Sequence, residues 1–99
     1  MIKQVVDVDG YWTVVVGYNV YLGDLDSGFT NTIFSRKVSF VGIGEASSAK
    51  QFMNTIAHEI KHVQSHVCAY YSVPEDGESA AYLTGYLTMK MFEVFKDLL

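Results

Sequence analysis

The segment AKQFMNTIAHEIKHVQSHVCAYY, residues 49–71, has the clearest secondary-structure pattern in the chain, and the other elements are assigned relative to it. Ser47 and Ser48 precede it as candidate N-caps, and Gln51 follows Ser48 by three residues, as in a capping box. Its apolar residues recur every three or four positions, the period of one face of an α-helix: Phe52, Met53, Ile56, Ile60, Val63, Val67 and Tyr70. The pattern predicts one long amphipathic helix over residues 49–71.

A second helix is predicted after Pro74, because a proline disfavours helical backbone in the residue before it. The acidic pair Glu75-Asp76 suits a helix N-terminus, where negative charge is favourable. The second helix therefore begins near Pro74 or at Glu78 and runs to near Leu98. Gly85 lies inside it at a cost of about 1 kcal/mol relative to alanine, so we expect a close approach of two helices there.

The chain before residue 44 has the composition of β-strands. IKQVVDVDGYWTVVVGYNVYLG, residues 2–23, is rich in Val, Tyr and Trp, and Asp9-Gly10 predicts a type I′ hairpin turn within it. GDLDSGFTN, residues 23–31, has the composition of a loop. TIF (32–34) and RKVSFVGIG (36–44) then supply one or two further strands.

These elements predict an α+β fold in a single domain spanning residues 1–99. It comprises a small, mostly antiparallel sheet of three or four strands, then the long helix and a second, antiparallel helix. The net charge of -4 argues against a nucleic-acid partner held through phosphates. Cys68 is the only cysteine, and no apolar run approaches the roughly 18 residues that a membrane span requires. We therefore expect a cytoplasmic protein without a signal peptide, bound neither to nucleic acid nor to a membrane.

The motif HEIKH, residues 58–62, lies on the predicted long helix. His58 and His62 are four residues apart, so they project from the same side, about 6 Å apart along the axis. Two imidazoles so placed can both bind one zinc ion at about 2.0–2.1 Å. Glu59 points elsewhere and can reach a zinc-bound water. The motif therefore predicts two zinc ligands, His58 and His62, with Glu59 as the general base.

A catalytic zinc site needs a third protein ligand. His66 lies about 12 Å along the helix axis from His58, which is too far for both to bind one ion. Glu78 follows His62 by 16 residues and falls in the first turn of the second helix, where an antiparallel return would bring it beside the histidines. The pair Glu75-Asp76 competes from the turn. We predict Glu78 as the third ligand.

HEIKH followed by GESAAYLTGYL, residues 77–87, resembles the gluzincin class of zinc metallopeptidases. In that class the two histidines of HExxH and one glutamate of a following helix hold the zinc. More narrowly, the chain resembles the very small gluzincin-like proteins of bacteria and their phages, over residues 47–87. The resemblance implies a zinc metallopeptidase with ligands His58, His62 and Glu78 and base Glu59. Tyr82 stands where the larger members often have an aspartate, and the gap between His62 and Glu78 is short.

The expected substrate is a peptide or protein that binds as an added strand along a sheet edge, either residues 11–22 or residues 37–43. Tyr82 and His66, each one turn past a predicted ligand, are candidate donors to the oxyanion. The aromatic-rich strands are a candidate homodimer face. Two alternatives stay open: a degenerate zincin in which metal stabilises an interaction module without catalysis, and an interaction protein that binds no metal.

Overall fold

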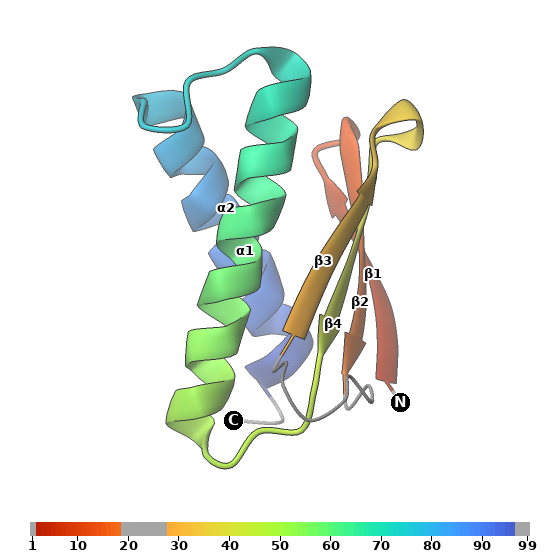
Figure 1. The fold of residues 1–99 in the computed structure, drawn as a ribbon, viewed down its shortest axis with the longest axis vertical. Helices are drawn as coiled ribbons and strands as arrows, with labels where there is room; N and C mark the ends of the chain where they lie inside the picture. Colours follow the sequence, from red (N-terminus) through yellow and green to blue (C-terminus); the bar gives the residue numbers. More distant parts are fainter. Residues whose placement is uncertain (1, 19–27, 97–99) are drawn as a thin grey trace.

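The structure is a computed structural model that describes residues 2–18 and 28–96. It has two layers, a four-stranded sheet and two helices that lie together on one face of it (Figure 1). The elements in chain order are β1 (Ile2–Val8), β2 (Trp12–Tyr18), β3 (Gly28–Ile33), a 3₁₀ turn (Phe34–Arg36), β4 (Val38–Ile43), α1 (Ala49–Tyr71) and α2 (Glu78–Phe95). The predicted α+β class, with a sheet followed by two helices, is confirmed.

The sheet is mixed, with strand order β1-β2-β4-β3. β1 pairs antiparallel with β2, and β3 pairs antiparallel with β4, whereas β2 and β4 are parallel neighbours. The connection between β3 and β4 is short, and Lys37 closes it with a left-handed backbone (φ 53°). This tight return makes β3 and β4 adjacent, and β2 lies on the other side of β4. Because β2 runs parallel to β4, the sheet is not purely antiparallel.

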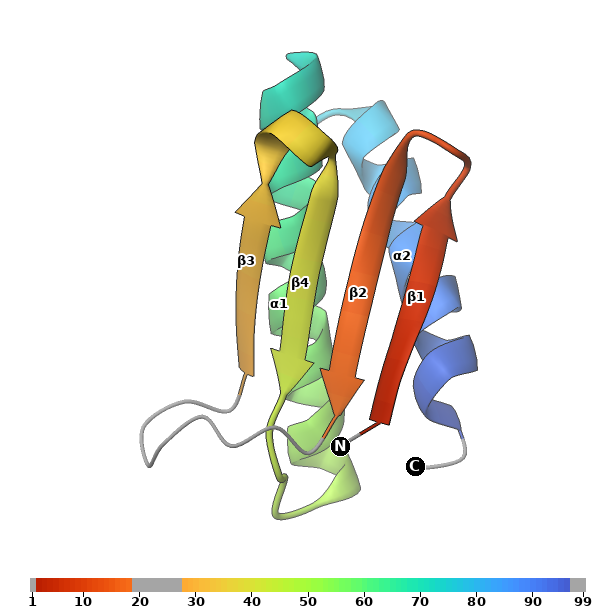
Figure 2. The same cartoon turned by 90° about the vertical axis from the view of Figure 1, so that its right-hand side faces the viewer.

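The strand β3 corrects two expectations. Residues 28–31, expected in a loop, belong to it; residues 19–27 of that expected loop lie outside the described residues. The two expected substrate edges, residues 11–22 and 37–43, contain β2 and β4, which are interior strands. The edges of the described sheet are β1 and β3. Figure 2 shows β3 and β4 in front of α1, with β1 in front of α2.

The local signals in the sequence give the expected turns and caps. Asp9 and Gly10 both have positive φ, 50° and 78°, as a type I′ turn requires. Ser48 caps α1 by accepting a hydrogen bond from the backbone N–H of Gln51. α1 ends where Ser72 takes a left-handed backbone (φ 56°). α2 begins at Glu78, the later of the two expected starts; Leu98, its expected end, lies outside the described residues.

One apolar core lies between the layers. Its largest fully buried side chains are Trp12, Phe95, Ile43 and Leu87. The close helix approach expected at Gly85 is not made between α1 and α2, because a side-chain carbon built there would meet nothing within 4 Å in the described chain. Neither α1 nor α2, the helices of the described residues, is long and apolar enough to cross a lipid bilayer.

Candidate metal centre

His58 and His62 form a close pair on the exposed side of α1. Their Nε2 atoms are 3.1 Å apart and their ring centroids 4.8 Å apart. Without metal, that distance suits a hydrogen bond in which one imidazole carries its proton on Nε2 and the other accepts. The pair therefore points the same ring atom of both histidines at one place.

The spacing of the pair fits two ligand positions of a tetrahedral zinc ion. Bonds of about 2.0–2.1 Å at a tetrahedral angle put two ligand nitrogens roughly 3.3–3.4 Å apart. The observed 3.1 Å between the Nε2 atoms is within a few tenths of an ångström of that value. His58 and His62 can thus bind one metal ion with little movement of either side chain.

Glu59 is buried between α1 and β3, with 4% of its surface exposed. The hydroxyl of Thr30 in β3 donates a 2.7 Å hydrogen bond to its Oε1. The start of β3 comes so close that a side-chain carbon at Gly28 would lie 3.1 Å from Glu59 Oε2 and 2.9 Å from Thr55 Cγ2. Only glycine fits there without a shift. The edge strand therefore fixes the predicted general base.

His66 ends a chain of hydrogen bonds that crosses the core. Trp12 Nε1 lies 3.0 Å from Ser39 Oγ, which lies 2.7 Å from Thr32 Oγ1, which lies 2.6 Å from His66 Nδ1. The indole N–H can only donate, so Ser39 accepts from it. If Ser39 then donates to Thr32 and Thr32 donates to His66, every hydroxyl proton of the hydrogen-bond chain has an acceptor within it. The reverse direction would leave the proton of the fully buried Ser39 hydroxyl without an acceptor in this chain.

This direction corresponds to one tautomer of His66. In it Nδ1 accepts from Thr32, and a neutral ring carries its proton on Nε2, from which His66 can donate. The ring of His66 lies 6.5 Å, centroid to centroid, from that of His62. Of the two residues predicted to assist catalysis, His66 is therefore positioned next to the histidine pair.

Removing the hydroxyl of Ser39, at the centre of this chain of hydrogen bonds, is expected to destabilise the protein. Ser39→Ala leaves the indole N–H of Trp12 and the hydroxyl of Thr32 short of a buried partner, a loss of about 1–3 kcal/mol in the free energy of unfolding. Urea unfolding measures it, with exposed Ser47→Ala as the control, expected to change stability by less than about 0.5 kcal/mol. Equal stability of the two variants would show that the buried hydrogen bonds of Ser39 do not stabilise the fold.

Glu78 and Tyr82 are not brought to the histidines. Both line a shallow depression on the exposed face of α2, whose other lining residues also belong to α2: Ala81, Gly85, Tyr86 and Met89. Among the described residues, no three His, Cys, Asp or Glu side chains are grouped so that they could hold a metal ion. Glu78 as third ligand and Tyr82 as oxyanion donor remain predictions.

Glu75, the competitor of Glu78, contacts the histidine-bearing helix. Its Oε2 accepts hydrogen bonds from Ser65 Oγ at 2.9 Å and from Lys61 Nζ at 3.2 Å. The bonds from Ser65 and then Lys61 lower the pKa of the Glu75 carboxyl from its ordinary value. Lys61 follows His58 by three residues and Ser65 follows His62 by three, so each is a neighbour of the pair on the helix surface. The Glu75 carboxylate lies one row of side chains from the candidate site.

Sequence reasoning missed the part that β3 plays in the site. Gly28, Thr30 and Thr32 all lie against residues of α1, yet Gly28 and Thr30 were expected in a loop and only Thr32 in a strand. The alternation of FTNTI, residues 29–33, with threonine at every second position, was the available signal. The glycine and aspartates that precede these residues favoured the assignment of a loop instead.

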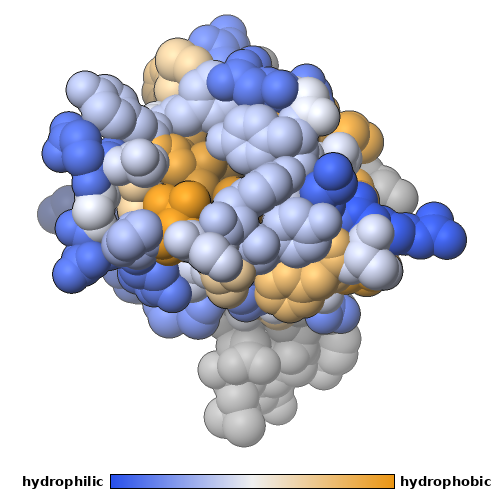
Figure 3. Space-filling view, turned by 90° about the horizontal axis from the view of Figure 1, so that it is seen from above, coloured by the Kyte–Doolittle hydropathy of each residue, from blue (hydrophilic) through white to orange (hydrophobic). Residues whose placement is uncertain are grey.

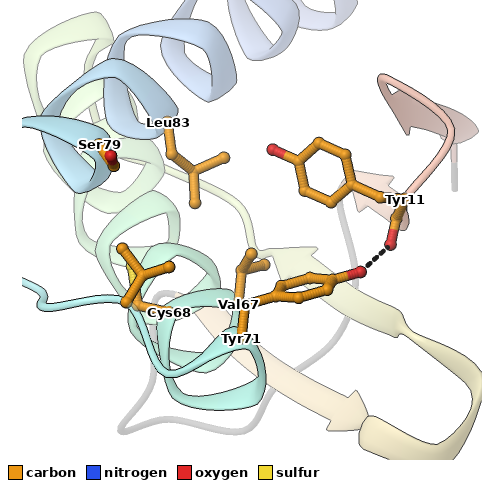
Figure 4. Close-up of a pocket in the computed structure, with 7 residues that line it drawn as sticks. Tyr11, Val67, Cys68, Tyr71, Ser79 and Leu83 are labelled. Atoms are coloured by element: carbon orange, nitrogen blue, oxygen red, sulfur yellow. Dashed lines mark hydrogen bonds between the residues drawn. The ribbon is translucent and has the colours of Figure 1, made fainter.

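A separate apolar pocket of about 310 Å³ lies at one end of the molecule. Viewed from that end, apolar side chains show in a hollow among more polar ones (Figure 3). Figure 4 shows Leu83, Val67 and Cys68 beside the rings of Tyr11 and Tyr71, where the Tyr71 hydroxyl donates to the Tyr11 carbonyl. Burial raises the pKa of the Cys68 thiol, which is consistent with a small apolar role. The residues lining this pocket include no histidine and no carboxylate.

Comparisons with models of protein families, with curated proteins and with solved structures found no match. The gluzincin resemblance therefore remains a prediction from the motifs HEIKH and GESAAYLTGYL. Function is inferred from the residues of the site.

Proposed function

We propose that the protein is a zinc-dependent metallopeptidase in which His58 and His62 bind the metal and Glu59 is the general base. One observation carries the proposal: the two Nε2 atoms lie 3.1 Å apart on a helix that packs against an edge strand. Bound zinc would polarise the peptide carbonyl and lower the pKa of a water toward about 7. The one-cysteine composition favours a cytoplasmic location.

Glu59 is suited to move the proton of the attacking water to the leaving amine. A carboxylate has about four acceptor positions, and Thr30 occupies one of them on Oε1. The acceptor positions on Oε2 face the region of Gly28. The Thr30 bond and the tight fit at Gly28 also restrict rotation of the side chain, which keeps the base in one orientation.

The peptide substrate is proposed to pair with the outer edge of β3. Among the described strands β3 has a neighbour on one side only, and an extended peptide can pair with the other side. Thr30 and Thr32 of β3 bond to Glu59 and His66, so a peptide on this edge lies beside both residues. His66 would then donate from Nε2 to the carbonyl oxygen as negative charge develops.

The third ligand is proposed to be a carboxylate, and zinc titration of three variants identifies it. Glu78→Gln, Glu75→Gln and Asp76→Asn each remove one candidate, and loss of the true ligand is expected to weaken zinc binding by at least about 100-fold. Isothermal titration calorimetry measures the affinity, with exposed Glu45→Gln as the matched control. Weak binding by Glu78→Gln alone supports the sequence prediction. Unchanged binding by all three variants would contradict a carboxylate ligand from this region.

A second candidate function is a metal-stabilised interaction module without catalysis. Two observations favour it: Glu59 is buried and bonded to Thr30, and the described residues gather no complete ligand set. In this case zinc should raise the melting temperature of the wild type and not that of His58→Ala, while no peptide of a mixed library is cleaved. Cleavage that depends on zinc would exclude this candidate.

A further inference from the structure

The outward face of α2 is apolar, although it is not part of the core. At about 100° per residue, Ala81, Tyr82, Gly85, Met89 and Phe92 share an arc of about 100°, opposite the buried face of the helix. Tyr82 is 73% exposed, Met89 53% and Phe92 54%. A helix that is apolar on both faces is usually covered on both. This outer face therefore has the character of a contact surface.

Gly85 lies near the middle of this face, and no neighbour within the described chain requires a glycine there. Glycine is unfavourable inside a helix relative to alanine, and here a side-chain carbon would meet nothing within 4 Å. With Ala81 one turn earlier, it leaves a shallow notch in the helix surface, beside the exposed side chains of Tyr82 and Met89. A notch of this kind allows another helix to approach closely.

We propose that this face binds the same face of a second copy of the chain, with the two α2 helices antiparallel. Glu78 and Lys96 are eighteen residues apart, which is five helical turns, so they point in the same direction from opposite ends of the face. An antiparallel pairing that sets Glu78 against the Lys96 of the other copy also sets Gly85 against Met89. The same register sets Tyr82 against Phe92.

Each of these pairs is complementary and occurs twice, as a two-fold interface requires. The carboxylate of Glu78 meets the ammonium of Lys96, and the notch at Gly85 receives the Met89 side chain. The rings of Tyr82 and Phe92 also meet. Lys96 already bonds to Glu93 of its own helix at 3.3 Å, and an ammonium has three donors, so it can serve both acids. A face that binds some other protein does not need to be complementary to itself. The self-complementarity of this face therefore favours a second copy of the chain as the partner.

Sedimentation equilibrium of the protein, from about 1 µM to about 1 mM, tests the proposal, since a contact made by one helix face of each copy is expected to be weak. The wild type is expected to dimerise. Gly85→Leu and Met89→Glu should each raise the dimer dissociation constant by at least about tenfold. Gly85→Leu should also raise the melting temperature of the monomer, because leucine is the better helix former and has open space. A simple folding defect would lower it instead.

Two further variants locate the contact. Val5→Glu lies on the other face of the sheet, where Val5 is 66% exposed, and should leave the dimer unchanged. Lys96→Glu should weaken the dimer, and adding Glu78→Lys should restore it. A wild type that stays monomeric, or a dimer broken by Val5→Glu and not by the α2 variants, would overturn the proposal. Failure of the double swap to restore the dimer would overturn the antiparallel register.

Discussion

Glu59→Gln is expected to reduce peptide hydrolysis by roughly 10²–10⁴-fold while zinc affinity stays within about threefold of the wild type. The amide keeps the size of the carboxylate, and its oxygen can still accept from Thr30, so the fold and the histidine pair should be preserved. It cannot take a proton from water. A loss of turnover without a loss of metal therefore assigns the proton transfer to Glu59.

Cleavage of a mixed peptide library by the zinc-loaded protein, followed by mass spectrometry, measures this effect. Glu45→Gln, an exposed change outside the site, is the matched control and should cleave like the wild type. Thr30→Val should show an intermediate loss, because Glu59 then lacks its hydrogen bond from β3. If wild type and Glu59→Gln cleave equally, Glu59 is not the base. If neither cleaves although zinc binds, the non-catalytic alternative stands.

His58→Ala and His62→Ala are each expected to weaken zinc binding by at least about 100-fold, since each removes one of two convergent imidazoles. The stabilisation of the folded protein by zinc should disappear together with zinc binding. For the wild type, free zinc at about 100 times its dissociation constant adds about 2.7 kcal/mol to the free energy of unfolding. Calorimetric titration and thermal unfolding, with and without zinc, measure the two effects.

His66→Ala is the matched control for this experiment. It removes a histidine from the same helix, but His66 Nδ1 is bonded to Thr32 at 2.6 Å, and the ring lies one turn beyond the pair. Its zinc affinity should stay close to that of the wild type, while its peptidase activity falls. A loss of zinc affinity as large as that of His62→Ala would place His66 among the ligands and contradict the two-histidine site.

The helices could be predicted well because their determinants are local. The apolar period of residues 49–71, the Ser48 cap and the Asp9-Gly10 turn each depend on residues a few positions apart, and the structure has all three. The His58–His62 spacing belongs to the same class, because four residues on any α-helix bring two side chains to one side. The close pair of histidines could therefore be predicted without knowledge of the fold.

The sequence by itself determined the α+β class, both helices and the close pair of imidazoles, since each follows from short-range backbone geometry. Only the tertiary structure decided that β3 is the edge strand beside α1, that Thr30 bonds to Glu59, and that Trp12, Ser39 and Thr32 form one hydrogen-bond chain to His66. It also decided that Glu78 points outward on α2. The bonds between Trp12 and Ser39, Thr30 and Glu59, and Thr32 and His66 join residues 27 to 34 positions apart. The side on which one element meets another depends on how all the layers pack. No local pattern encodes that choice.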